Sequence, residues 1–361
     1  MRDLIIVGNN LANLPTASVE VVKCLKNVAR VIWVNINYCS PTASFNGDRP
    51  LLSLPRKRMD EVQSLTLSVK LAHDIPGSSV MGTTGAKQQI LAQLHPFLRK
   101  HHVSRPLIWT SDLNIADIHL SIDGASLVFY SDREFDNSAT EMMQELAMIQ
   151  HADIIFGATE KICARYPSSK TFLLRHGVDL KLFCSPTSAA NDLPRNKPVA
   201  GYYGSLDHSI DYQMLLLCAL STPDWNFVIL GKNTLPYYPL PKLNNVFYLG
   251  DKEHRQLPSY SQHWQACLLP LNTPRPCADD IEAKLLEYLA VGSPVISSAQ
   301  ITDSRFNKYI NHVDSAYEMS NALKLAAYEP KGSADIVFSD CWQVRSRYVD
   351  NILNRYSLSN L

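Results

Sequence analysis

Apolar runs and stretches of helical period alternate along most of the chain. In the first half, short continuous apolar runs predict buried strands at residues 3–8, 30–35, 106–112 and 126–132. In the second half the same signal recurs in the segments VAGYYGS, NFVILG, NVFYLG and ACLLPL. Apolar positions at helical spacing separate several of these strands, for example over residues 139–151. This alternation predicts an α/β fold with two doubly wound parallel sheets.

Residues 279–298, DDIEAKLLEYLAVGSPVISS, carry the least ambiguous pattern and predict a helix, a stop and a buried strand. Lys284 and Glu287 fall on a polar edge of this helix, outside its apolar face. Gly292 suits the left-handed exit of a helix, and Pro294 prevents its continuation. The apolar face comprises Ile281, Leu285, Tyr288 and Leu289. The polar edge is therefore available to face a ligand.

The chain is long for one hydrophobic core, because 361 residues exceed what a single core usually holds. We therefore expect two domains. Residues 184–198, CSPTSAANDLPRNKP, are rich in Ser, Pro, Ala and Asn without periodicity, which is typical of an interdomain linker. We place the boundary near Asn191, so that residues 1–190 form the first domain.

Composition narrows the class of protein. Lys plus Arg and Asp plus Glu balance at 34 each, which disfavours a nucleic-acid partner. The eight cysteines are scattered without CxxC spacing, so we expect reduced thiols, no metal site and a cytoplasmic location. No apolar run reaches the ~18 residues of a membrane span, and we expect the mature chain to begin near Met1. The basic residues 56–58 leave open a peripheral contact with the inner face of a membrane, the alternative being a solvated turn.

Candidate chemistry gathers at predicted strand ends, because open α/β sheets bind ligands at the carboxyl ends of their strands. Asp132 ends one such strand and is a candidate general base. The alternative for Asp132 is a helix cap or a surface acid, and rivals for the base are Glu134 and Asp136. The loop after the first strand is a candidate ligand contact, unless it is an ordinary turn, and comprises Gly8, Asn9 and Asn10.

Two glycine turns in the second half are candidate phosphate sites. Gly204 and Ser205 follow one predicted strand, and Gly231 and Lys232 follow another. Backbone N–H groups at such strand ends, near the start of a helix, can hold an anion. Tight turns that bind nothing would explain the same residues.

Several segments resemble, in the right order, the glycosyltransferases of the GT-B fold, and in particular the bacterial group 1, family 4-like enzymes that assemble polysaccharides. These segments are RHGVDLKLF, GYYGSLDH, PDWNFVILG, NVFYLG, LPSY and EAKLLEYLAVGSPVIS. The last is the most specific, because its Lys, Glu-Tyr, Ala-x-Gly and Pro-Val keep the family's spacing. The resemblance is strong over residues 125–300 and vague over residues 36–104. It implies two Rossmann-like domains facing across a cleft: an acceptor-binding domain (1–190), a nucleotide-sugar-binding domain (191–338) and a final helix (339–361) that returns to the first domain.

The resemblance also implies roles for individual residues. Glu287 matches the glutamate that holds the nucleotide ribose hydroxyls, and Lys284 matches the basic residue at the diphosphate. The other positions implied or suggested for donor binding are Gly204, Ser205, Lys232, Gly250, Asp279 and Asp280. Asp279 stands where retaining enzymes carry a second glutamate that grips the donor sugar. Asp132 aligns with the catalytic base of some inverting relatives, and the sequence leaves inversion or retention open.

Two further positions are expected to serve packing. His176 replaces the asparagine of the family's Asn-Gly-Val-Asp turn. Trp342 matches a tryptophan near the start of the last helix, where the family's chain crosses back to the first domain. The alternative is that residues 340–356 pack on the second domain.

Together these features predict a glycosyltransferase. It would move a sugar from a nucleotide-diphosphate donor, with a UDP-sugar favoured, to a glycan or lipid-linked saccharide acceptor in cell-surface polysaccharide biosynthesis. The nucleotide sugar is a co-substrate, and no cofactor is expected. Because no Asp-x-Asp motif precedes the nucleotide site, we expect metal independence. Two alternatives stay open: a GT-B-like binding or assembly protein without turnover, and a sugar-nucleotide epimerase of the same fold.

Overall fold

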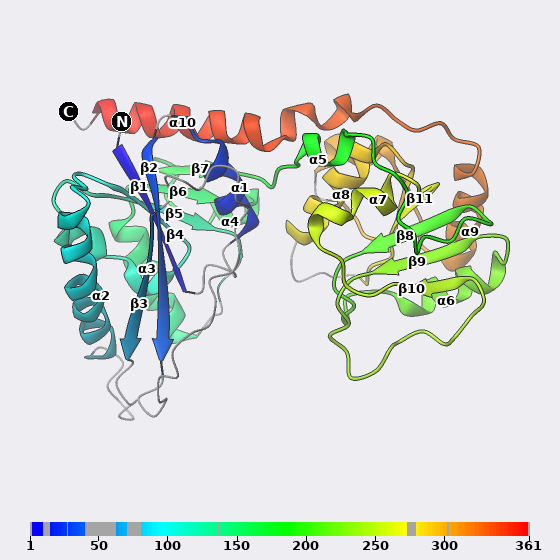
Figure 1. Ribbon diagram of the computed structural model, residues 1–361, viewed down its shortest axis with the longest axis horizontal. Coiled ribbons are helices and arrows are strands. Elements are labelled where there is room, and N and C mark those ends of the chain that lie inside the picture. The colour runs from blue at the N-terminus through cyan, green and yellow to red at the C-terminus, as the bar shows by residue number, and fades with distance from the viewer. Residues whose placement is uncertain are drawn as a thin grey trace. The chain divides into compact units, whose positions relative to one another are not determined.

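The computed structural model describes residues 2–9, 15–26, 28–39, 63–70, 81–133, 135, 138–272, 279–301 and 303–359. Its contacts divide the chain into two compact units, residues 1–175 with 345–361 and residues 176–344 (Figure 1). Each unit contains one sheet whose described strands all pair in parallel. The predicted α/β fold with two doubly wound sheets is therefore confirmed.

The first unit is built on a seven-stranded sheet in the order β3-β2-β1-β4-β5-β6-β7. Its strands are β1 (Arg2–Asn9), β2 (Val28–Cys39), β3 (Gln63–Lys70), β4 (Leu107–Thr110), β5 (Ser126–Ser131), β6 (Ile154–Gly157) and β7 (Thr171–Leu173). Residues 4–7 of β1 are at most 1% exposed, because helices cover both faces of the sheet. The strand order reverses between β1 and β4, which is where open sheets of this kind bind ligands.

Helices and a stacked aromatic core hold this sheet. The helices are α1 (Thr16–Cys24), α2 (Met81–Lys100), α3 (Ala139–His151) and α4 (Glu160–Cys163), with 3₁₀ helices η3 (Leu113–Ile115) and η4 (Ile118–Ser121). Trp109 of β4 stacks on Phe156 of β6, with 5.4 Å between ring centroids. Its indole Nε1 donates to Ser18 Oγ at 2.9 Å, which ties α1 to the sheet. Helix α3 has the bounds predicted from the sequence.

The last helix, α10 (Trp342–Ser359), packs mainly on the first unit (Figure 1). Asp350 Oδ2 accepts from the Lys26 N–H at 3.0 Å. Tyr356 OH donates to Asp153 Oδ1 at 2.6 Å. From residue 345 onward the helix thus returns to the first unit, as predicted.

The boundary between the units falls after residue 175, whereas the sequence placed it near Asn191. The segment that follows residue 175 already belongs to the second unit. Val178 forms a parallel bridge with Cys341, and the side chain of Phe183 is buried in the core of the second unit, 1% exposed. The linker-like composition therefore marks an extended segment on the surface of the second unit.

Trp342 marks the point at which α10 leaves the second unit. Its ring lies edge-on to His176, with 4.9 Å between centroids. A Cβ built on Gly177 would lie 2.6 Å from the indole, so the glycine makes room for it. Residues 340–344 pack on the second unit and the rest of α10 on the first, so each of the two alternatives for this helix holds for one part of it.

The second unit is built on a six-stranded sheet in the order β10-β9-β8-β11-β12-β13. Its strands are β8 (Val199–Tyr203), β9 (Asn226–Leu230), β10 (Val246–Tyr248), β11 (Ala266–Leu269), β12 (Val295–Ser297) and β13 (Ile310–His312). Its helices are α5 (Leu180–Cys184), α6 (Tyr212–Ser221), α7 (Pro258–Ser261), α8 (Asp279–Val291) and α9 (Ala316–Ala326), with 3₁₀ helices η5 (His254–Gln256), η6 (Ser304–Tyr309) and η7 (Ala334–Asp340).

Helix α8 packs on this sheet through the predicted apolar face. Its four members are at most 7% exposed and comprise Ile281, Leu285, Tyr288 and Leu289. Tyr288 OH also accepts from the Tyr203 N–H of β8 at 3.1 Å. Gly292 ends the helix with a left-handed φ of 81°, as its position predicted. This packing fixes which side chains of α8 reach the carboxyl edge of the sheet.

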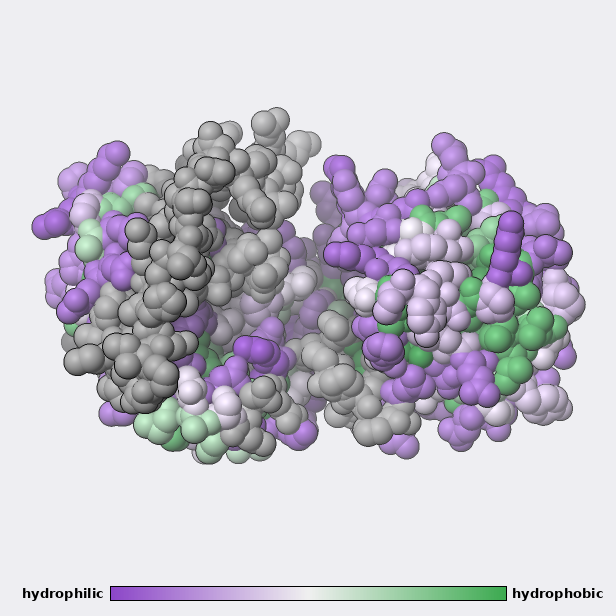
Figure 2. Space-filling view, turned by 90° about the horizontal axis from the view of Figure 1, so that it is seen from below, coloured by the Kyte–Doolittle hydropathy of each residue, from purple (hydrophilic) through white to green (hydrophobic). Residues whose placement is uncertain are grey.

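Among the residues coloured in Figure 2, many are polar, and hydrophobic patches lie on the second unit. Among the helices that the structure describes, none is long and apolar enough to span a membrane.

Candidate functional site

Three glycines meet at the carboxyl ends of β8, β9 and β10. Gly204, Gly231 and Gly250, here called the glycine cluster, have φ angles of 143°, 132° and 75°, which side-chain-bearing residues rarely adopt. The Gly204 N–H donates to Leu230 O at 3.1 Å, and the Gly231 N–H donates to Gly250 O at 2.8 Å. A Cβ on Gly231 would lie 1.9 Å from Gly204 O. The ends of β8 and β9 therefore approach one another more closely than a side chain on Gly231 would allow.

Lys284 of α8 lies beside this cluster. A Cβ built on Gly204 would lie 2.4 Å from Lys284 Cε and 3.1 Å from Lys284 Nζ. The same Cβ would lie 2.7 Å from Tyr202 OH, which donates to Ser205 O at 3.3 Å and steadies the turn after β8. A bare backbone turn and an ammonium group are thus held together at one strand end.

Glu287 lies one helical turn further along α8, and its side chain is only 11% exposed. Tyr203 OH donates to its Oε2 at 2.7 Å. His254 Nε2 lies 2.6 Å from its Oε1. Burial and the nearby Glu287 carboxylate raise the pKa of the Tyr203 phenol well above its usual value. The phenol therefore stays protonated and remains a donor to the carboxylate at physiological pH.

This arrangement suits an anionic ligand that also carries hydroxyl groups. An ammonium group offsets the charge of a phosphate, and glycine turns let its oxygens approach the backbone. A recessed carboxylate accepts hydrogen bonds from paired hydroxyls. Lys284 and Glu287 stand three residues apart on one helix, so the two functions are spaced by about one helical turn.

The remaining predicted donor positions lie around this centre. Ser205 is exposed beside Gly204, and Lys232 is exposed directly after Gly231. The Leu206 N–H donates to Lys232 O at 2.9 Å, which joins the two turns. Asp279 and Asp280 are the first residues of α8, and their side chains lie outside the described part of the chain. Contact of these four residues with a donor stays a prediction.

At the carboxyl edge of the first sheet, the loop predicted to start at Gly8 begins later. Strand β1 pairs with β2 through Gly8 and Asn9, so both residues belong to the strand. The pairing continues because β2 is longer than predicted and extends to Cys39. Asn10 lies outside the described residues.

Asp132 directly follows β5 and is half-buried. Ser131, the last residue of the strand, is fully buried, and its Oγ lies 3.0 Å from Tyr166 OH. Its two rivals lie outside the described residues and are Glu134 and Asp136. The position of Asp132 at a strand end is as predicted, and its catalytic role stays a prediction.

Sequence reasoning missed His254. It opens the 3₁₀ helix η5, shortly after β10, and reaches Glu287 across 33 residues of sequence. The available signal was a polar residue shortly beyond a predicted strand, in the segment NVFYLGDKEH. That signal is weak, since most residues just past strand ends are polar.

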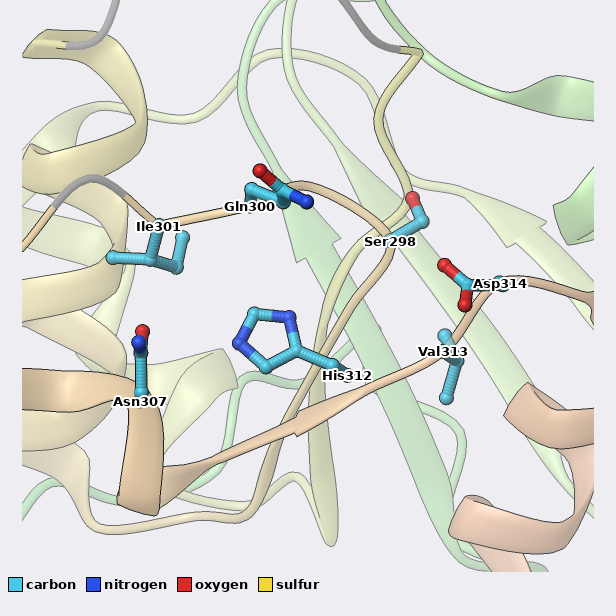
Figure 3. A pocket seen from close by; sticks show the side chains of 7 residues that line it. All are labelled: Ser298, Gln300, Ile301, Asn307, His312, Val313 and Asp314. Atoms are coloured by element: carbon cyan, nitrogen blue, oxygen red, sulfur yellow. The ribbon is translucent and has the colours of Figure 1, made fainter. Parts of the chain in front are cut away.

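The same carboxyl edge has a hollow beyond β12 and β13, with a volume of about 350 Å³. Figure 3 shows His312 and Gln300 projecting into it. None of the predicted site residues lines this hollow. Among the described residues, no group of three His, Cys, Asp or Glu side chains is arranged to hold a metal ion. Metal independence stays a prediction.

Comparison with known proteins bears on the fold and the family. No protein-family model matches the chain. TuaH of Bacillus subtilis, named for a glycosyltransferase role in teichuronic acid biosynthesis, is 25% identical over 177 residues. That match spans 45% of this chain and 45% of TuaH, which is less than half the length of either protein.

Two solved structures resemble the chain along nearly its whole length. HepE of Anabaena, in complex with UDP and glucose, has a TM-score of 0.63 at 12% identity, covering 100% of both chains. The lipopolysaccharide outer core galactosyltransferase WaaB has a TM-score of 0.60 at 12% identity, covering 99% of this chain and 100% of its own. At such low identity the likeness concerns the fold. The chain therefore has the GT-B fold of glycosyltransferases, and the resemblance seen in its sequence is confirmed at that level.

Proposed function

We propose that the chain is a glycosyltransferase that moves a sugar from a nucleotide-diphosphate donor to a glycan or lipid-linked saccharide acceptor in cell-surface polysaccharide biosynthesis. One observation carries the proposal: Lys284 Nζ lies beside Gly204, and the recessed carboxylate of Glu287 follows one turn along the same helix. HepE, solved with UDP and glucose, supports a UDP-sugar as the donor. The name of TuaH supports the polysaccharide context.

The donor is held, in this proposal, from its ribose to its sugar. Glu287 accepts hydrogen bonds from the two ribose hydroxyls. Lys284 and the turns at Gly204 and Gly250 face the diphosphate and the nucleoside. Lysine is suited to this place because the departing nucleoside diphosphate gains negative charge in the transition state. The proposed set is completed by Ser205, Lys232, Asp279 and Asp280.

The reaction forms a bond from an acceptor oxygen to the anomeric carbon and breaks the bond from that carbon to the diphosphate. The nucleoside diphosphate leaves with the electron pair. With inversion, Asp132 takes the proton of the acceptor hydroxyl as general base. With retention, a phosphate oxygen of the donor takes that proton. Residues Gly8, Asn9 and Asn10 are proposed to contact the acceptor.

The chemistry proposed here uses no metal ion and no cofactor beyond the nucleotide sugar. Lys284 supplies positive charge at the position where a metal-dependent enzyme would place its cation. We propose action in the cytoplasm, with peripheral contact at the inner membrane face when the acceptor is lipid-linked. Activity that survives a metal chelator would agree with metal independence.

A panel of UDP-, GDP- and ADP-sugars tests the proposal directly. The protein is incubated with each donor, with and without saccharide acceptors, and release of nucleoside diphosphate is followed by mass spectrometry. Protein-dependent hydrolysis or transfer from one donor, lost on Glu287→Ala, supports the proposal. Binding without release points to a GT-B-like binding protein, and conversion of the sugar without transfer points to an epimerase. Failure to bind, hydrolyse or transfer any donor contradicts the proposal.

A further inference from the structure

The carboxylate of Glu287 has one internal hydrogen-bond donor on each oxygen. Tyr203 OH donates to Oε2 at 2.7 Å, and His254 Nε2 lies 2.6 Å from Oε1. Each carboxylate oxygen can accept about two hydrogen bonds, so each retains capacity for one more. Two donors on opposite oxygens also fix the rotation of the carboxylate about its last bond. The remaining acceptor positions are therefore oriented before any ligand arrives.

The two donors differ in their surroundings. Tyr203 is fully part of the core, at 4% exposure, so its hydroxyl serves both folding and the site. The His254 side chain is 57% exposed. An ion pair or hydrogen bond at such an exposed side chain contributes little to folding stability. Its geometry, however, bears directly on the buried oxygen of Glu287.

His254 is held by two neighbouring elements. Glu253 is the N-cap residue of the 3₁₀ helix η5, and its N–H donates to Gln256 Oε1 at 3.1 Å. The imidazole lies edge-on to the ring of Phe183, with 5.4 Å between centroids and 61° between planes. Phe183 itself is buried, so the imidazole packs against a ring that is held in the core.

The position of Phe183 depends on the segment RHGVDLKLF. Asp179 Oδ1 accepts from the Leu182 N–H at 3.0 Å and caps α5, the short helix that carries Phe183. Gln262 Nε2 then donates to Phe183 O at 2.8 Å. A line of contacts within the second unit therefore runs from this segment through Phe183 and His254 to Glu287.

We propose that His254 is a positioning residue of the donor site. Acting through Glu287, it holds the carboxylate in the orientation that accepts both ribose hydroxyls, and Phe183 holds the imidazole in place. This inference rests on the proposed function, in which Glu287 binds the ribose. It gives a functional role to His254, whose side chain is too exposed to contribute much to the core.

The test compares the affinities for UDP and 2′-deoxy-UDP by calorimetry. The quantity of interest is the ratio of the two dissociation constants, because a loss of fold would weaken both ligands alike. In the wild-type protein we expect this ratio to be about tenfold, the usual effect of removing a hydroxyl that a carboxylate accepts. Glu287→Ala should reduce the ratio to about one.

His254→Ala should bring the ratio close to that of Glu287→Ala. His254→Gln places an amide N–H near the former Nε2 and should restore most of the discrimination. Arg255→Ala removes the neighbouring side chain, which is 79% exposed, and should leave the ratio as in the wild type. Circular dichroism checks that all variants are folded.

Each outcome decides between the two proposals. A wild-type ratio kept by His254→Ala overturns the positioning role and leaves the donor site standing. A loss in His254→Ala that His254→Gln does not restore also overturns it, because the hydrogen bond to Glu287 would not be the cause. A wild-type protein that binds none of UDP, GDP and ADP overturns the proposed function and this inference together.

Discussion

The carboxyl edges of the two sheets are built differently. At the edge of the second sheet, three left-handed glycines bring strand ends together, and α8 adds an ammonium group and a recessed carboxylate. At the edge of the first sheet, an acid lies just beyond each of two neighbouring strands: Asp112 beyond β4 and Asp132 beyond β5. Asp112 Oδ1 accepts from the Asn114 N–H at 3.0 Å and caps η3. The second edge thus brings together glycine turns, an ammonium group and a carboxylate, whereas the first offers single acids.

Under the proposed function, this difference separates the residues that bind the donor from those that bind the acceptor. A nucleotide has the same diphosphate and ribose whichever sugar it carries, so one local motif can serve it. Acceptors differ from enzyme to enzyme, and the residues proposed above to contact the acceptor all belong to the first unit. The donor assignment can therefore be tested residue by residue, while the acceptor assignment depends first on Asp132.

The largest effect is expected at Asp132. Asp132→Asn should lower the rate of transfer by about 10²- to 10⁴-fold, because the acceptor loses its general base. Donor affinity, measured by calorimetry, should not change. Asp112→Asn is the matched control at the neighbouring strand end and should keep transfer close to the wild-type rate. Unchanged turnover in Asp132→Asn would shift the base role to Glu134, Asp136 or the substrate itself.

A stability contrast within the glycine cluster comes next. Gly231→Ala would place a Cβ 1.9 Å from Gly204 O in a left-handed conformation, and we expect a loss of about 3 kcal/mol in the free energy of unfolding. Gly250→Ala meets nothing within 4 Å, so we expect about 1 kcal/mol from its dihedral alone. Urea unfolding, followed by a probe in the second unit, measures both. Equal losses would show that the close approach of the strand ends is not the cause.

At Lys284 the expected effect is smaller and specific to phosphate. Lys284→Met should weaken UDP binding about tenfold, since one charge-assisted contact to the diphosphate is lost. Binding of uridine, which has no phosphate, should be the same in both proteins. If uridine weakens as much as UDP, Lys284 supports the fold of the site and not the diphosphate.

Alkaline titration gives the smallest effect. Burial raises the pKa of Tyr203 in the second unit and of Tyr166 in the first. The unfolded chain therefore releases these protons first, near the ordinary phenol pKa of 10.0, and stability should be fully present below that pH and fall above it. Tyr203→Phe should reduce the loss of unfolding free energy with rising pH in the second unit, and leave that of the first unit unchanged. A slope unchanged by this substitution would contradict the assignment.

The sequence predicted α8 and its apolar face because that information is local. Apolar spacing fixes the buried face, and the positions of Lys284 and Glu287 on the opposite edge follow from helical geometry. Neither β3 nor β13 was predicted as a strand, and each lies at an edge of a sheet. In β13 two of the three residues are exposed, so its sequence lacks the continuous apolar run of a central strand.

His254 could not be found in the same way. Its partner Glu287 lies 33 residues away, and only the packing of η5 against α8 brings the two together. Phe183, which also contacts His254, lies still further away in sequence, on α5. Contacts between elements depend on the whole fold, whereas spacing within one helix does not. Residues that act through a neighbour are for this reason the part of a site that a single sequence reveals least.

The return of α10 to the first unit has a consequence for biosynthesis. Synthesis proceeds from the N-terminus, so residues 1–175 emerge long before the segment 345–361 that completes their unit. The second unit is contiguous along residues 176–344 and can form before the first is complete. During translation the first unit stays incomplete until residues 345–361 are made, and the surface that later receives α10 is uncovered until then. A chain that lacks residues 345–361 would therefore leave incomplete the unit whose other residues were made first.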